Sequence, residues 1–268
     1  MILLWTVVSA LVTLLLVCFG AIDNVGTGML ALVICFFGQL FVWAIVGVIG
    51  TLFVDIHKDN QKDSKFFRFY AYSIENILRC VLRYKVNISG FEKLPVCKFL
   101  LVSNHRSAFD AIIQLAVFRK YNMSFVSKKE NISMPIFGKI MYRCSAVPLD
   151  RDDIRQAAKA ILRATELIKT DVAAMGIYPE GTRNKGEGLL PFKAGSFKIA
   201  QKAKCPVAIV VMENSELVMK NAPFRKTNVN LKILKVLPVE YVMEHTTAQL
   251  SEEAYNMILE VLCNSKLQ

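Results

Sequence analysis

Hydrophobic positions divide the chain into two parts with different patterns. Residues 2–22 form an uncharged apolar run, and residues 24–54 form a second one that is densely apolar from Met29 onward. As helices, both runs are long enough to cross the hydrocarbon layer of a membrane, which is about 30 Å thick. The polar turn between them contains two glycines. The pattern predicts a hydrophobic helical hairpin over residues 1–57 that anchors the chain, either spanning the membrane or dipping into one leaflet.

Residues 58–268 follow another pattern, in which short apolar runs alternate with amphipathic stretches. The first stretch, residues 64–84, mixes aromatic and basic side chains at helical spacing, which suits a membrane interface or a core-packing helix. Runs of strand length and helix length then alternate over residues 96–103, 108–118, 123–127, 134–142, 146–150, 154–168, 173–178, 192–203, 206–212, 229–239 and 248–262. This alternation predicts one α/β domain with a mostly parallel mixed sheet flanked by helices. Such sheets bind ligands in loops beyond the carboxyl ends of their strands.

The charge distribution follows the same division. Residues 1–57 hold two of the 22 acidic side chains and none of the 33 basic ones, which leaves the rest of the chain with a net charge of +13. The positive-inside rule therefore places residues 58 onward on the cytoplasmic side of the cell membrane, because four bases closely follow the second run: Lys58, Lys62, Lys65 and Arg68. We expect the hairpin to be retained, because no base precedes the first run as in a cleaved signal peptide.

The positive excess also indicates which partners the domain can bind. It is complementary to anionic phospholipid headgroups, to an acidic carrier protein and to the phosphates of a nucleotide carrier. We expect no nucleic acid partner, because no nucleic-acid-binding module accompanies the charge. We also expect no metal site, because the three histidines, at positions 57, 105 and 245, lack metal-ligand spacing.

The first loop that could carry chemistry follows the apolar run at residues 96–103. It contains His105, and Asp110 stands where the next helix begins. With His105 still in the turn, the carboxylate can fold back onto one imidazole nitrogen and leave the other free to accept a proton. His105 and Asp110 are therefore a candidate general-base dyad. The alternative is that Asp110 only complements the dipole of the helix.

The second loop, residues 178–184, has the sequence Tyr-Pro-Glu-Gly-Thr-Arg-Asn. Gly176 and Gly181 have the spacing of a phosphate-binding P-loop, but Thr182 and Arg183 stand where that motif needs Lys followed by Ser or Thr. What remains is a turn that presents a carboxylate, a hydroxyl and a guanidinium. A guanidinium suits a phosphate monoester, although a surface salt bridge is the alternative.

Together, these two loops resemble the first and third motifs of the glycerolipid acyltransferases, most closely the 1-acyl-glycerol-3-phosphate O-acyltransferases. The matching patterns are Asn104-His105-x4-Asp110 and the sequence from Tyr178 to Arg183, and their order and separation suit the family. Residues 86–95, 125–138, 146–151 and 191–195 are similar to further family segments. The chain departs from the family at Ile209, where a second proline is frequent, and this departure concerns the choice of acyl chain.

The resemblance implies an enzyme that transfers an acyl group from a thioester to the sn-2 hydroxyl of 1-acyl-glycerol-3-phosphate, giving phosphatidate for phospholipid biosynthesis. It implies His105 as the base and Asp110 as the group that holds the imidazole. It also implies a substrate-binding set of Asn104, Lys128, Arg151, Glu180, Gly181, Thr182 and Arg183. Arg183 would hold the phosphate, assisted by Lys128 and Arg151. No cofactor is implied, and the donor is either acyl carrier protein or coenzyme A loaded with the acyl group.

Several alternatives stay open on the sequence alone. The acceptor could be glycerol-3-phosphate or another lysophospholipid, or the chain could bind membrane lipid without turnover. A Ser107 nucleophile is the alternative to direct attack by the hydroxyl. The oxyanion needs donors, and backbone N–H groups at residues 104–107 or around Gly181 are the candidates.

Overall fold

The computed structural model describes residues 1–58, 63–150, 153–186 and 188–264. By its internal contacts the chain divides into two compact units, Met1–Asp55 and Ile56–Gln268. The boundary lies close to residue 57, where the sequence pattern changes.

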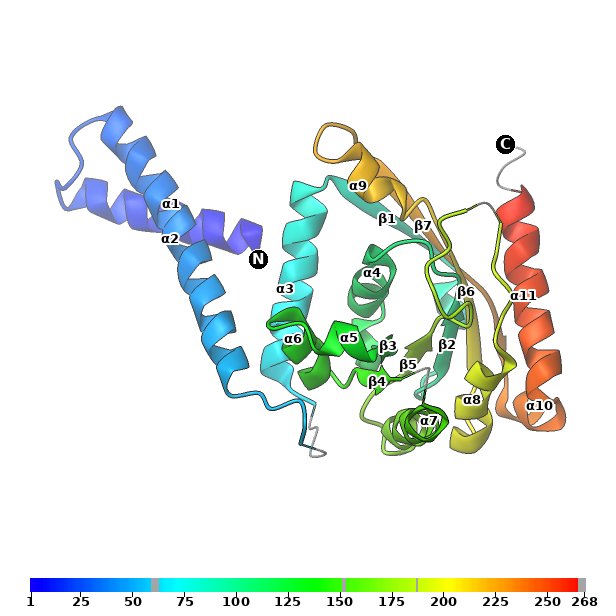
Figure 1. Ribbon diagram of the computed structural model, residues 1–268. Coiled ribbons are helices and arrows are strands. Elements are labelled where there is room, and N and C mark those ends of the chain that lie inside the picture. The colour runs from blue at the N-terminus through cyan, green and yellow to red at the C-terminus, as the bar shows by residue number, and fades with distance from the viewer. Residues whose placement is uncertain (59–62, 151–152, 187, 265–268) are drawn as a thin grey trace. The chain divides into compact units, whose positions relative to one another are not determined.

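The first unit is a pair of helices, α1 (Ile2–Cys18) and α2 (Val25–Leu52), joined by a short turn (Figure 1). The side chain of Asn24 caps α2 by accepting a hydrogen bond from the Thr27 N–H. Helix α2 has the length and composition to cross a membrane, whereas α1, with 17 residues, is shorter. At 1.5 Å per residue, α1 extends about 26 Å, which is close to the lower limit for a spanning helix, so the crossing of the membrane by the first run stays a prediction. The helix ends early because Phe19 to Ala21 close the turn.

The second unit is built on a sheet whose strands are β1 (Tyr84–Ser89), β2 (Leu100–Ser103), β3 (Ser124–Lys128), β4 (Val147–Leu149), β5 (Met175–Ile177), β6 (Val207–Glu213) and β7 (Thr227–Leu237). Their order is β1-β7-β6-β2-β5-β3-β4. Strands β2 to β6 run parallel to one another, β7 is antiparallel to β6, and β1 is parallel to β7. The predicted α/β class with a mostly parallel mixed sheet is confirmed.

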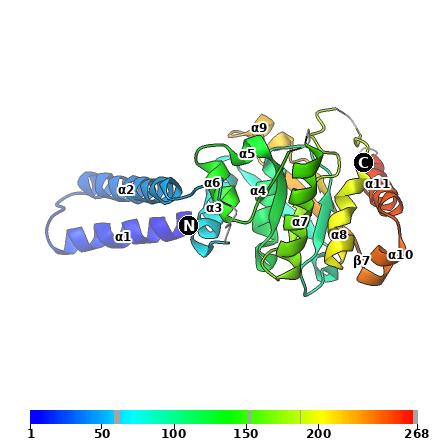
Figure 2. The same ribbon diagram turned by 60° about the horizontal axis from the view of Figure 1, so that its bottom comes forward.

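Helices cover both faces of this sheet. On one face lie α7 (Ile154–Lys169), α8 (Lys198–Ala203) and α11 (Thr247–Asn264), and on the other lie α3 (Lys65–Val81) and α4 (Phe109–Val117) (Figure 2). The remaining helices are short: α5 (Lys129–Ile132), α6 (Phe137–Arg143), α9 (Leu217–Asn221) and α10 (Val239–Glu244), with 3-10 turns at Phe91–Lys93, Arg119–Tyr121 and Ala194–Phe197. Parallel strands covered in this way read as continuous apolar runs, as the sequence does here.

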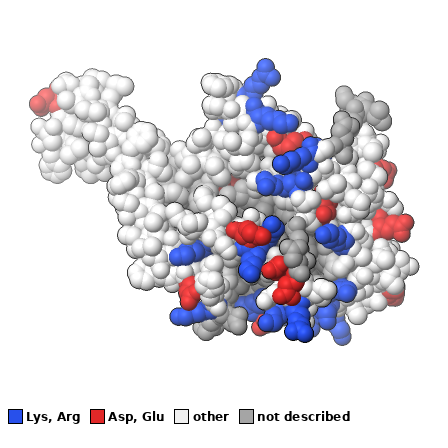
Figure 3. All heavy atoms as spheres, in the orientation of Figure 1, with Lys and Arg blue, Asp and Glu red and all other residues white. Residues whose placement is uncertain are grey.

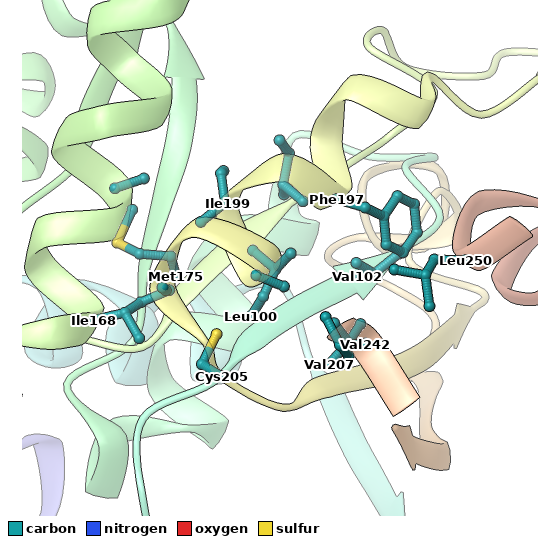
Figure 4. Close-up of a cluster of buried hydrophobic side chains, with 14 of the residues drawn as sticks. Leu100, Val102, Ile168, Met175, Phe197, Ile199, Cys205, Val207, Val242 and Leu250 are labelled. Atoms are coloured by element: carbon teal, nitrogen blue, oxygen red, sulfur yellow. The ribbon is translucent and has the colours of Figure 1, made fainter. Parts of the chain in front are cut away.

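Strand β2 lies in the middle of the core. Leu100, Leu101 and Val102 are fully buried, and Leu100 and Val102 pack with Met175 and Ile199 on the face covered by α7 and α8 (Figure 4). Close packing on both faces fixes the position at which β2 ends. The first candidate loop leaves the sheet from this point.

Candidate active site

The fold brings the two candidate loops together at one edge of the sheet. Strands β2 and β5 are neighbours, and Val102 lies opposite Ile177 in their parallel register. Because the carboxyl ends of parallel strands meet at the same edge, the residues after Val102 and after Ile177 lie side by side. Two direct contacts join the loops: the His105 N–H donates to Glu180 Oε1 at 2.6 Å, and the Asn184 N–H donates to the His105 carbonyl at 2.8 Å.

His105 and Asp110 are in hydrogen-bond contact. The distance from His105 Nδ1 to Asp110 Oδ2 is 2.8 Å, and the Arg106 and Ser107 N–H groups donate to the same oxygen, each at 2.8 Å. Three N–H groups thus converge on a fully buried carboxylate oxygen, which assigns the proton on His105 to Nδ1. The Nε2 atom keeps its lone pair, and among the described residues nothing binds it. The His105 side chain is 18% exposed, so a reactant can reach it.

A stack of aromatic rings fixes the plane of the imidazole. The His105 ring lies on Tyr178 at 4.1 Å between centroids, and Tyr178 lies on Phe125 at 5.6 Å, with each pair close to parallel. The Tyr178 hydroxyl donates to Gln114 Oε1 at 3.2 Å. Burial raises the pKa of Tyr178 well above its ordinary value, so the hydroxyl stays protonated. The sequence analysis assigned no role to Tyr178 or Gln114, because ring stacking across strands has no spacing signal.

A glycine makes room for this stack. A Cβ at Gly176 in β5 would lie 2.2 Å from the nearest carbon of the Phe125 ring. No side chain therefore fits at this position while Phe125 lies over the strand and supports Tyr178. The P-loop-like spacing of Gly176 and Gly181 thus has a packing cause.

Glu180 is engaged with the backbone of both flanking loops. It is 5% exposed, and its second oxygen accepts a hydrogen bond from the Leu190 N–H at 3.0 Å. Burial raises the pKa of Glu180, while the N–H groups of His105 and Leu190 oppose that shift. Through these two bonds Glu180 holds the loops together, and its predicted contact with a substrate stays a prediction.

Asn104 also turns inward. It is 1% exposed, and its amide exchanges two 2.8 Å hydrogen bonds with the backbone N–H and carbonyl of Met212 in β6. Its side chain therefore acts as an extra residue of the ladder between β2 and β6. Both ends of the amide are thus engaged with β6 in the residue before His105, and the contact of Asn104 with a substrate stays a prediction.

The cationic residues lie around the same loop. Thr182 and Arg183 are exposed, and no described residue pairs with the Arg183 guanidinium. Gly181 has a positive φ of +75°, and a Cβ there would lie 3.1 Å from Lys193 Nζ. The Lys193 ammonium therefore lies against the backbone that carries Thr182 and Arg183. The sequence analysis did not place Lys193 in the substrate-binding set, because its approach to Gly181 depends on the tertiary fold.

The other two predicted cations have different outcomes. Lys128 lies at the carboxyl end of β3 and forms an exposed ion pair with Glu130 at 3.0 Å. Arg151 lies outside the described residues.

Most of the expected oxyanion donors are already engaged. The N–H groups of His105, Arg106 and Ser107 donate to Glu180 or Asp110, and the Gly181 N–H donates to the Tyr178 carbonyl at 3.0 Å. The expectation that the turn at residues 104–107 supplies the oxyanion site is therefore wrong for these three groups. The Ser107 hydroxyl accepts a hydrogen bond from the Phe109 N–H and contacts neither His105 nor Asp110 by any bond in the described chain.

The same region of the chain matches a known family. Residues 85–213, which contain both loops and strands β2 to β6, match the family model described as Acyltransferase. These residues are therefore similar to the Acyltransferase family. This confirms the resemblance drawn from the motifs at His105 and Tyr178.

Curated relatives of this domain are 1-acyl-sn-glycerol-3-phosphate acyltransferases. The protein of Saccharomyces cerevisiae is 26% identical over 70% of this chain and 63% of its own length. The chloroplastic protein of Arabidopsis thaliana is 39% identical over 47% of this chain and 35% of its own length. The Salmonella typhimurium protein is 28% identical over 58% and 62%. The chain thus spans from about a third to just under two thirds of the length of these relatives.

A solved structure shares the fold over nearly its whole length. The crystal structure of the 1-acyl-sn-glycerophosphate acyltransferase PlsC from Thermotoga maritima superimposes with a TM-score of 0.62, covering 100% of this chain and 99% of that one. At 19% sequence identity, the likeness establishes the fold of the acyltransferase domain and its apolar N-terminal region. An apolar N-terminal helix is consistent with membrane localisation.

Proposed function

We propose that this chain transfers a fatty acyl group from an acyl thioester to the sn-2 hydroxyl of 1-acyl-glycerol-3-phosphate, giving phosphatidate. The observation that carries the proposal is the contact between His105 Nδ1 and Asp110 Oδ2 beside the exposed Arg183 loop. It combines a base with a free Nε2 and an unpaired guanidinium on one edge of the sheet. The family of residues 85–213 and the relatives' names support the same chemistry.

In this reaction His105 Nε2 accepts the proton of the acceptor hydroxyl as its oxygen attacks the thioester carbonyl. A new C–O ester bond forms and the C–S bond breaks. The proton passes from His105 to the departing thiolate, so the histidine returns to its starting state. Asp110 stays an acceptor throughout and stabilises the imidazolium. The Ser107 hydroxyl accepts a hydrogen bond from the Phe109 N–H and forms none with His105 among the described residues, which favours direct attack by the substrate hydroxyl over an acyl-serine.

The phosphate of the acceptor binds to Arg183, and Lys193 is a second cation beside the same loop. A planar guanidinium forms two parallel hydrogen bonds with a phosphate, and an ammonium adds a point charge. The Thr182 and Arg183 N–H groups have no partner among the described residues, so they are the available oxyanion donors of this loop. Fixing the phosphate and the acyl chain together positions the hydroxyl for attack.

The units Met1–Asp55 and Ile56–Gln268 have different roles in this proposal. The apolar hairpin attaches the chain to the membrane in which the acceptor is dissolved, and the acyltransferase domain faces the cytoplasm, where acyl thioesters are made. We expect either acyl carrier protein or coenzyme A as the carrier of the donor, with no resident cofactor. Anionic phospholipids form the membrane surface that the basic domain contacts.

The experiment is an acyl-transfer assay on the full chain in detergent. It offers lysophosphatidate, glycerol-3-phosphate and a lysophospholipid without a phosphomonoester, each with palmitoyl thioesters of both carriers. We expect phosphatidate from the wild type, and a loss of about 10³-fold or more for His105→Ala because the base is removed. Arg183→Gln should raise KM for lysophosphatidate by about tenfold, as expected for a lost charged hydrogen bond.

Lys185→Gln is the matched control for Arg183→Gln, since Lys185 is an exposed cation two residues further along the same loop. It should leave KM unchanged. The proposal fails if His105→Ala retains turnover, or if the wild type prefers an acceptor without a phosphomonoester. An inactive wild type that still binds vesicles would indicate a lipid-binding protein instead.

A further inference from the structure

Two segments far apart in sequence form an exposed tip, which we define as residues 79–85 and 219–226. Arg83 joins them, because its guanidinium donates to the Phe224 carbonyl at 3.1 Å and its carbonyl accepts from the Thr227 N–H at 3.1 Å. The tip thus consists of the end of α3, the start of β1 and the loop between α9 and β7. These contacts make it one surface.

The tip exposes apolar side chains that a soluble surface normally buries. Phe224 is 86% exposed, Met219 is 60% exposed and Val81 is 57% exposed. All three lie among polar groups and not in a groove, so no folded part of the unit is available to cover them. An aromatic ring projecting from a loop in this way is suited to enter another apolar phase.

The charge of the tip has a single sign. The two segments contain six basic residues and no acidic one: Arg79, Arg83, Lys85, Lys220, Arg225 and Lys226. Only Arg79 pairs with a carboxylate in the described chain, through Glu75 at 3.1 Å. Figure 3 shows Lys and Arg side chains gathered at the top of the view, over the region of α9 and the loop that follows it.

The tip lies at the same edge of the sheet as His105. Strand β7 is antiparallel to β6, so it begins at the edge where β2, β5 and β6 end, and β1 begins beside it. The ion pair between Arg106 Nε and Glu216 Oε1, at 3.4 Å, connects the residue after His105 to the segment that leads into α9. A surface that contacts the tip therefore also faces the edge that carries the candidate active site.

We propose that the tip is a second membrane contact, in which Phe224 and Met219 enter the headgroup layer of an anionic bilayer and the cations bind the lipid phosphates. Exposed apolar side chains surrounded by Lys and Arg are the pattern of proteins that lie in the membrane interface. A nucleic acid would pair with the cations but would leave Phe224 and Met219 exposed. The contact would turn the active-site edge toward the lipid surface.

The experiment measures contact with lipid and does not depend on acyl transfer. The full chain carrying Phe224→Trp is reconstituted into phosphatidylcholine vesicles with and without phosphatidylglycerol, and recovery with the floating vesicles is checked for every variant. Its emission is compared with that of the wild type, whose Trp5 and Trp43 lie in the hairpin. Brominated phosphatidylcholine then quenches any tryptophan that reaches the lipid.

With phosphatidylglycerol present, we expect the emission added by Phe224→Trp to move to shorter wavelength and to lose about half its intensity to the brominated lipid. Changing Lys220, Arg225 and Lys226 to Gln in the same background should remove both effects. Val96→Trp is the matched control, because Val96 is 93% exposed at the opposite edge, just before β2, and should stay unquenched. Met219→Trp repeats the test if Phe224→Trp does not fold.

The proposal is overturned if the tryptophans at 224 and 219 are quenched no more than the one at 96 while the chain floats with anionic vesicles. It is also overturned if their emission shifts only when acyl carrier protein is added, which would make the tip a protein-docking site. A wild type that does not float would contradict attachment by the hairpin, which is a separate part of the proposed function. In that case, quenching after addition to preformed anionic vesicles still decides the role of the tip.

Discussion

The orientation of His105 depends on three neighbouring side chains. Asp110 fixes one ring nitrogen at 2.8 Å, Tyr178 supports the ring face, and Glu180 fixes the backbone N–H of His105 itself. Each contact removes one freedom of the imidazole, which is how a base is held ready before the substrate arrives.

The stack predicts that Tyr178 is a positioning residue. Tyr178→Phe keeps the ring and loses only the bond to Gln114, so kcat should stay near the wild-type value. Tyr178→Leu removes the ring, and kcat should fall about tenfold, since misplacement of a base by about 1 Å costs this much or more. KM for lysophosphatidate should stay near the wild-type value, because the substitution leaves the Arg183 loop unchanged. A Leu variant with an unchanged kcat, or with KM raised as much as kcat is lowered, would contradict the positioning role.

Glu180 predicts a pH dependence of stability. Burial raises the pKa of Glu180 above its ordinary value, so the folded chain binds this proton more readily than the unfolded one. Its contribution to stability is then greatest below the unfolded pKa and is lost as the pH rises through the folded pKa. In chemical unfolding from about pH 4 to about pH 7, the stability of the wild type relative to Glu180→Gln should fall as the pH rises. A difference that is constant or grows with pH would contradict this.

At the level of elements, the adjacency of β2 and β5 creates the site. Neither strand is long, and each ends where the next residues turn toward the same edge. A buried cation on helix α3 joins that helix to the segments before β3 and β4. Arg68 is 4% exposed and donates to Asp63 and to the carbonyls of Met123 and Cys144. Burial lowers the pKa of Arg68, but the bond and charge of Asp63 raise it more, so the guanidinium stays charged.

Arg68→Met should therefore destabilise the acyltransferase domain strongly. The substitution removes the cation that pairs with the Asp63 carboxylate, which keeps only the Ser145 hydroxyl among its side-chain donors in the described chain, and it removes a donor from two carbonyls. Breaking a buried pair in this way costs about 3–5 kcal/mol. Arg163→Met is the control, because Arg163 and Glu166 form an exposed pair on α7 and its loss should cost less than about 1 kcal/mol. Urea unfolding in detergent measures both. Equal losses of unfolding free energy in the two variants would show that the Arg68 network contributes no more to stability than a surface pair does.

At the scale of the whole molecule, the two units have opposite surface chemistry. The first is apolar on its outside, with residues such as Phe41 and Ile45 exposed, whereas the second carries all the basic residues. A surface of exposed apolar side chains on two paired helices requires a non-aqueous environment. The predicted membrane attachment therefore depends on the apolar surface of the first unit and not on a single residue.

The full chain should stay with the membrane in high salt and alkaline carbonate and be released by detergent. Phe41→Lys combined with Ile45→Lys should make it extractable by carbonate, because each charge in the middle of α2 costs about 3 kcal/mol in the bilayer. Val96→Lys, an exposed position in the second unit, is the control and should behave as the wild type does. Release of the wild type by salt alone would contradict anchoring by the hairpin.

Much of this organisation could be predicted from the local pattern. The apolar runs before residue 57 predict the hairpin, the alternation after it predicts the α/β class, and the spacing of His105 and Asp110 predicts their contact. These features depend on neighbours in sequence, where periodicity and turn geometry act. Helices α5, α9 and α10 were not predicted, since each is too short for a periodic signal.

By itself, the sequence determined the two chemistries of the chain and the residues that could form a base and a phosphate site. The tertiary structure decided the rest: that β5 lies beside β2, that Asn104 and Glu180 bond to backbone groups of other segments, and that Lys193 reaches Gly181. The physical reason is the range of the interactions. Strand order, burial and ring stacking join residues separated by many positions, and their energies depend on which surfaces meet in the folded core.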